Sequence, residues 1–106
     1  MSAPTVALEG REVVEVAKVA VFLRVFPEDI SISLENIVKE IEQKLPQGYS
    51  LKAWDEEPIA FGLKALRLLI TMPEEIEGGT EPLEQLISQV PGVSQVEVLM
   101  VHRVLE

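Results

Sequence analysis

Apolar and polar residues alternate along residues 16–26, a stretch that is rich in β-branched side chains. Lys18 and Arg24 fall in the same phase of the alternation, so an extended chain places both on one face. The pattern predicts a β-strand whose buried face carries the other phase: Val19, Val21, Leu23 and Val25. Pro27 and the two acidic residues after it end this strand.

An apolar stripe with helical spacing comes next along the chain. Its members recur at i, i+3, i+4 and i+7: Leu34, Ile37, Val38, Ile41 and Leu45. This period predicts an amphipathic helix, and Ser33 stands directly before it, where a hydroxyl caps the first turn. Pro46 and Gly48 end the helix.

A second helix is predicted near the C-terminal end. Gly78 and Gly79 form a turn, Thr80 is placed to cap the helix, and Pro82 falls in its first turn. Its apolar stripe consists of Leu83, Leu86, Ile87 and Val90. Pro91 and Gly92 then stop the helix.

Three further segments alternate as strands do. The first is residues 49–57, and the second is residues 63–72, with Arg67 and Thr71 on one face. The opposite face of that second segment carries Leu66, Leu68, Ile70 and Met72. The last strand starts near residue 95, and we expect its inward side chains to be Val96, Val98 and Met100.

The order β-α-β-β-α-β in 106 residues predicts one α+β domain of the ferredoxin-like kind. We expect a four-stranded antiparallel sheet with both helices on one face and the first and third strands at its centre. Alternation leaves apolar residues on the uncovered face: Ala20, Phe22, Phe26, Ala65, Leu69 and Leu99. Such a face favours a partner, a second copy or the N-terminal segment.

Residues 1–15 show no clear period, and we expect either an arm or an extra edge strand there, with the domain itself in residues 16–106. Charged residues interrupt the apolar ones in this segment, so it does not resemble a secretory signal. No apolar run approaches the ~20 residues of a membrane span. We therefore expect a cytoplasmic protein that does not enter a membrane.

Charge and residue types exclude several functions. The net charge of −9 argues against direct nucleic-acid binding, which needs clustered Lys and Arg. The chain has no cysteine and one histidine, which excludes disulfides and thiolate catalysis and makes a zinc site improbable. Glu74, Glu75 and Glu77 fit no EF-hand spacing and are expected in a solvated turn. No catalytic set, phosphate-binding loop or metal motif is present, so no cofactor is expected.

The segment from Glu56 to Leu66 is unusual for a connection between strands. Pro58 stiffens it, Gly62 permits a positive φ, and Ile59 and Phe61 are large apolar side chains that a surface loop normally avoids. An apolar loop either folds inward or contacts a partner.

The run from Glu57 to Leu66 resembles the signature of the elongation factor 1-beta family, guanine-nucleotide exchange factors of translation. Three other segments resemble its short archaeal-type members: Leu45-Pro46-Gln47-Gly48, Gly78-Gly79-Thr80 and the run from Val90 to Val98. The resemblance covers about residues 16–103.

This resemblance implies a ferredoxin-like exchange domain whose partner is the GTPase elongation factor 1-alpha, without covalent chemistry. It also implies an apolar contact by Phe61 and a basic contact by Arg103, where eukaryotic members place a Lys near the C-terminus. The implied partner-binding set is Pro58, Ile59, Phe61, Gly62, Lys64 and Arg103. Glu56 and Glu57 then face basic residues of the GTPase or solvent, and the Phe61 loop and the end of the last strand form one working edge.

An alternative function remains open on the same fold. A small-ligand-binding regulatory or assembly domain would associate through the uncovered sheet face and bind a metabolite at the interface. Such a domain needs no GTPase partner.

Overall fold

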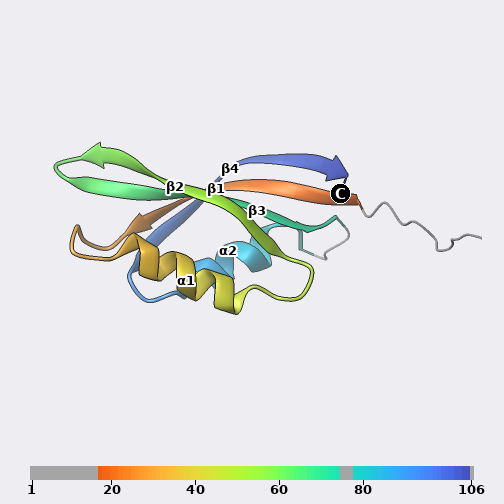
Figure 1. The fold of residues 1–106 in the computed structure, drawn as a ribbon, viewed down its shortest axis with the longest axis horizontal. Helices are drawn as coiled ribbons and strands as arrows, with labels where there is room; N and C mark the ends of the chain where they lie inside the picture. Colours follow the sequence, from red (N-terminus) through yellow and green to blue (C-terminus); the bar gives the residue numbers. More distant parts are fainter. Residues whose placement is uncertain (1–16, 75–77, 106) are drawn as a thin grey trace, which may run out of the picture.

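Two helices cover one face of a single sheet in the computed structural model, which describes residues 17–74 and 78–105 (Figure 1). The elements in chain order are β1 (Ala17–Pro27), α1 (Leu34–Lys44), β2 (Ser50–Ala60), β3 (Leu63–Pro73), α2 (Glu81–Ser88) and β4 (Val93–Leu105). The segment predicted as an arm or extra strand, residues 1–15, lies outside the described residues.

The four strands are antiparallel and lie in the order β2-β3-β1-β4. The two apolar strands β1 and β3 occupy the centre, as their alternation predicts. The ferredoxin-like architecture and the β-α-β-β-α-β order are therefore confirmed.

The core lies between the sheet and the two helices. The predicted stripes supply it: β1 and β3 contribute alternate residues, and each helix contributes its apolar face. The largest fully buried side chains are Val21, Leu23, Val25, Ile37, Ile41, Leu66, Ile70, Met72, Leu83, Ile87 and Val90. Each such side chain contributes about 1.5–3 kcal/mol of transfer free energy, so this one interface stabilises the whole domain.

The two helices begin differently. Ser33 caps α1 as predicted, because its Oγ accepts a hydrogen bond from the Asn36 N–H at 3.2 Å. Thr80 occupies the N-cap position of α2, but its side chain makes no capping bond. Its hydroxyl instead donates to Glu84 Oε2 at 2.9 Å, since the backbone of Thr80 is already close to helical. The capping role predicted for Thr80 is wrong.

The prediction that Met100 points inward is also wrong. The pairing of β4 with β1 shifts by one residue at Leu99, which places Met100 opposite Phe22 on the uncovered face. A β-bulge of this kind exchanges the two faces of every residue beyond it. Met100 is consequently 51% exposed, while Val96 and Val98 pack against the core as predicted.

Candidate functional site

The connection between β2 and β3 is a two-residue turn and not the long apolar loop that the sequence predicts. β2 continues through Pro58 and Ile59 to Ala60, which pairs with Leu63. Pro58 is tolerated because β2 is an edge strand, and the register shift next to it falls at Ile59. The hairpin extends beyond the helix layer, above the connection between β1 and α1 (Figure 1).

The turn itself consists of Phe61 and Gly62. Their φ angles are 52° and 81°, and two positive φ angles are what a type I′ hairpin turn requires. Gly62 adopts this conformation freely, whereas Phe61 is the only non-glycine residue with positive φ in the described part of the chain. A bulky side chain in this region costs on the order of 1–2 kcal/mol.

No packing offsets that cost. The Phe61 side chain is fully exposed, at 101% of its reference area, and Ile59 beside it is 44% exposed. Backbone strain that the fold does not use is characteristic of functional positions. Among the residues that the structure describes, the turn is therefore the strongest candidate contact.

Lys64 sits at the base of the turn, opposite Pro58. Its ammonium lies 3.4 Å from Glu56 Oε1, and both side chains are about half exposed. An exposed pair at that distance is weak, so both groups are available to a partner. The structure thus brings Pro58, Ile59, Phe61, Gly62 and Lys64 together on one hairpin.

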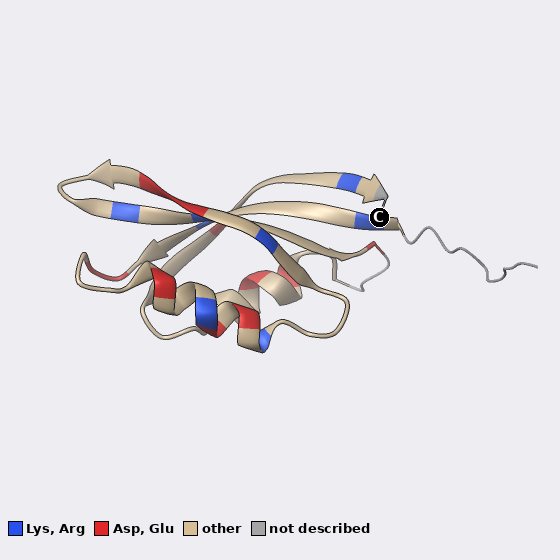
Figure 2. Cartoon of the chain, in the orientation of Figure 1, with Lys and Arg blue, Asp and Glu red and all other residues tan. Residues whose placement is uncertain are grey.

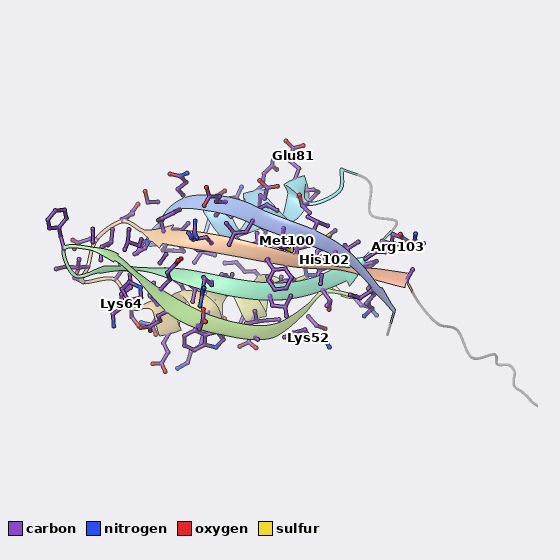
Figure 3. The ribbon with its side chains drawn as sticks, turned by 90° about the horizontal axis from the view of Figure 1, so that it is seen from above. Lys52, Lys64, Glu81, Met100, His102 and Arg103 are labelled. Atoms are coloured by element: carbon purple, nitrogen blue, oxygen red, sulfur yellow. The ribbon has the colours of Figure 1, made fainter. Side chains whose placement is uncertain are left out.

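Arg103 is not part of this cluster. It pairs with Val19 near the start of β1, whereas the turn lies beyond the end of β1. Figure 3 shows Lys64 and Arg103 toward opposite ends of the sheet. About ten residues of strand separate the two ends, which corresponds to roughly 30 Å. The single working edge expected from the sequence does not exist.

Arg103 has a partner within the chain. Its Nε lies 2.5 Å from Glu74 Oε2, although the Arg103 side chain remains 72% exposed. Glu75 and Glu77, the other two residues of the predicted acidic turn, lie outside the described residues. Within residues 17–74 and 78–105, no cluster of His, Cys, Asp and Glu has the geometry of a metal site.

The uncovered face of the sheet carries a row of charges across all four strands. Asp55, Arg67, Arg24 and Glu97 lie in register on β2, β3, β1 and β4. Arg67 holds Asp55 with two hydrogen bonds, one of 2.7 Å from Nε to Oδ1. These bonds lower the pKa of Asp55 below its ordinary value and raise the pKa of Arg67.

Arg24 links the two edge strands. Its Nε donates to Glu57 Oε1 at 2.8 Å and its Nη1 to Glu97 Oε1 at 2.9 Å. The hydrogen bond with Glu57 is the main cause that raises the pKa of Arg24. Glu57 is therefore occupied within the chain, and of the two carboxylates expected to face a partner only Glu56 is weakly held.

The uncovered face is hollowed next to the charged row, and Asp55 and Arg67 of the row line the hollow. A cavity of about 340 Å³ is lined mainly by apolar side chains, among them Phe22, Leu69 and Leu99. The ring of His102 stands edge-on to Phe22, with centroids 6.2 Å apart. The predicted apolar residues Phe22, Leu69 and Leu99 do lie on this face.

The charged row had a partial signal in the sequence. The four residues of the row, and Glu57 beside it, are charged residues within strands, all in the phase opposite to the core. The alternation does not show the register of the strands, and the register determines which charged residues lie next to one another. Only the pairing of the strands shows that Arg24 reaches both edges.

The chain is similar to a well-defined family. A family model described as the EF-1 guanine nucleotide exchange domain matches residues 20–104. Helices of the described residues include none that is long and apolar enough to span a membrane.

Individual proteins agree with the family match. A protein of Staphylothermus marinus named elongation factor 1-beta is 64% identical over 88 residues, which are 83% of this chain and 98% of that protein. A protein of the same name from Desulfurococcus amylolyticus is 66% identical over 87 residues, 82% of this chain and 97% of that protein. The elongation factor 1-beta of Aeropyrum pernix is 53% identical over 87 residues, which are 82% of this chain and 97% of that protein.

Proposed function

Because the chain belongs to the EF-1 guanine nucleotide exchange domain family, we propose that it promotes release of GDP from the GTPase elongation factor 1-alpha, so that GTP enters. The role in translation elongation is that of its family. We propose residues 16–106 as the exchange domain and the cytoplasm as its location.

The proposed action requires binding and no covalent step. A GTPase holds Mg²⁺ and the phosphates with its own groups. An exchange factor accelerates release when it binds the nucleotide-free state more tightly than the loaded state. By linkage, bound nucleotide weakens the factor's affinity by the same ratio.

The observation that carries this proposal is the exposed, strained Phe61. An aromatic ring at the tip of a hairpin provides a large apolar contact, and because the short turn already fixes the backbone, only the few torsions of the side chain are ordered on binding. Ile59 and Lys64 flank it on the same hairpin, and Pro58 and Gly62 fix the shape of the tip.

Arg103 is proposed as the basic contact at the other end of the sheet. Its guanidinium already binds one carboxylate, Glu74, so it engages the GTPase by exchanging that partner for an anionic group there. Since the two ends are roughly 30 Å apart, the proposed contacts address separate regions of the GTPase.

Phe61→Ala tests the proposal directly. We expect slower release of a fluorescent GDP analogue from elongation factor 1-alpha, by about tenfold or more, because an exposed aromatic anchor is lost. The melting temperature should stay nearly unchanged, since nothing packs on the ring. Lys39→Ala, at an exposed position of α1, is the matched control.

Two results would contradict the role of Phe61. Unchanged GDP release would remove the ring from the contact, and a loss of ~3 kcal/mol or more in unfolding free energy would make it a core residue.

The alternative of a small-ligand-binding or assembly domain draws on the 340 Å³ cavity of the uncovered face. It predicts self-association and a rise in melting temperature with an amino acid or similar metabolite. A wild-type chain that does not accelerate GDP release but shows both properties would favour this alternative.

A further inference from the structure

A second hollow, of about 420 Å³, lies under the β2–β3 hairpin and faces the start of α1. The connection between β1 and α1 forms one wall, with Ile30 and Ile32. The hairpin forms the other wall, with Trp54, Glu56 and Gly62. We call it the hairpin cleft. It lies at the same end of the molecule as the Phe61 turn.

Two large apolar side chains on the otherwise mostly polar walls of the hairpin cleft are open to solvent. Ile30 is 66% exposed and Trp54 is 39% exposed, although both are large apolar side chains. Each of two facing walls thus offers one exposed apolar side chain that a partner could cover. Small-molecule pockets bury about 70–90% of the surface of their ligand. Walls as open as these cannot bury that much. The cleft therefore suits a side chain that projects from another protein.

The charge of the hairpin cleft indicates which kind of residue would lie beside that side chain on the other protein. Three carboxylates line it, those of Asp29, Glu35 and Glu56, against the single ammonium of Lys64. Glu35 takes part in no ion pair among the described residues, and Glu56 holds Lys64 only at 3.4 Å. Figure 2 shows acidic residues on the β1–α1 connection and at the start of α1, on this side of the hairpin. Such a rim attracts cations and repels acidic segments.

We propose that the hairpin cleft binds a segment of the GTPase that carries an apolar side chain next to a Lys or Arg. The apolar side chain lies between Ile30 and Trp54, and the cation meets Glu35 and Glu56. This assignment rests on the proposed function, because it places the segment on the same partner that Phe61 contacts. It makes the acidic rim, and not the turn alone, a determinant of partner choice.

Binding to nucleotide-free GTPase at low and high salt tests the cleft. Glu35→Lys should weaken binding about threefold to tenfold at low salt, with a smaller effect at high salt, because the exposed charge is screened. Ile30→Ser should weaken binding about tenfold at both salt concentrations, because the lost contact is apolar. Glu35→Gln, which removes the charge without reversing it, should fall between wild type and Glu35→Lys.

Glu42→Lys is the matched control for charge. It makes the same change on the exposed side of α1, toward the far end of the helix from the cleft, and should bind as wild type does apart from a small general effect. Thermal unfolding of each variant verifies that the fold is kept.

The outcomes separate the two proposals. If wild type binds and accelerates GDP release while Ile30→Ser and Glu35→Lys match Glu42→Lys, the cleft assignment is overturned and the exchange function stands. If wild type does not bind the GTPase, both are overturned. Selective loss of binding in the cleft variants, together with accelerated GDP release by wild type, supports both.

Discussion

At Phe61, the stability of the turn and the proposed function favour different residues. The first position of a type I′ turn favours Asn, Asp or Gly, because these adopt positive φ at little cost. Phenylalanine gains nothing there from the fold, since its ring is fully exposed. The proposed contact of the ring with the GTPase would account for its presence.

Phe61→Asn should make the protein more stable. Relief of the positive-φ strain is worth about 1 kcal/mol, which corresponds to a rise of roughly 4–8 °C in melting temperature for a domain of this size. GDP release should slow as it does in Phe61→Ala, whose melting temperature stays near wild type because alanine keeps the strain. Equal melting temperatures for the Asn and Ala variants, measured by thermal unfolding, would mean that the turn is not strained.

At the scale of the strands, the charged row connects neighbouring strands by ion pairs across the uncovered face. Arg24 joins β2 to β4 across the two central strands, and the pair of Arg67 with Asp55 lies beside it. These side chains are partly exposed, from 29% for Arg24 to 57% for Asp55, so each ion pair on its own contributes little. Because they are held in register, the row opposes sliding of one strand past another.

The Asp55–Arg67 pair gives a pH dependence with a defined sign. The pKa of Asp55 is lowered in the folded chain, so its stabilising effect is complete above the ordinary value of 3.8 and is lost as the pH falls through the lower folded value. Asp55→Asn should reduce the loss of unfolding free energy below about pH 4, measured by urea titration at several pH values.

Glu42→Gln is the control for that pH profile, because Glu42 is exposed and belongs to none of the ion pairs of the described residues. Its profile should run parallel to wild type. A similar flattening in both variants would show that the effect belongs to total charge and not to this pair.

On the scale of the whole molecule, the sheet separates two proposed contacts. The hairpin turn and Arg103 lie at opposite ends, and they share no neighbour among the described contacts. Sites separated by more than ~10 Å normally contribute independently. The domain then behaves as a rigid spacer that fixes the distance between two contacts.

The double variant Phe61→Ala, Arg103→Ala measures this independence. We expect each single change to slow GDP release and the two reductions to multiply, within about 0.5 kcal/mol. The measurement is the rate of fluorescent-GDP release for the four proteins of the cycle. A double variant no slower than the worse single one would show that both residues act at one site, and an unaffected Arg103→Ala would remove Arg103 from the exchange contact.

The sequence predicts the fold well because each element carries one clear period. The stripes of α1 and α2 and the alternation in β1 and β3 determine what is buried, and burial determines the layers. Prediction from the pattern fails where a single residue interrupts the alternation of a strand. The shift at Leu99 turns Met100 outward, and Pro58 hides the continuation of β2. The predicted antiparallel order already places the β2–β3 turn beyond the end of β1 and the end of β4 beside the start of β1. The separation of Phe61 from Arg103 therefore follows from the topology, and a single working edge is inconsistent with it.

The register shifts have one further consequence. In the described part of the chain β2 and β4 are the edge strands, and their outer rims carry amide and carbonyl groups that another extended chain could join. Both rims are interrupted: β2 by shifts at Lys52 and Ile59 and by Pro58, and β4 by shifts at Ser94 and Leu99. A foreign strand therefore finds no long, regular rim for hydrogen bonding, which protects a domain with exposed apolar side chains from polymerising through its sheet.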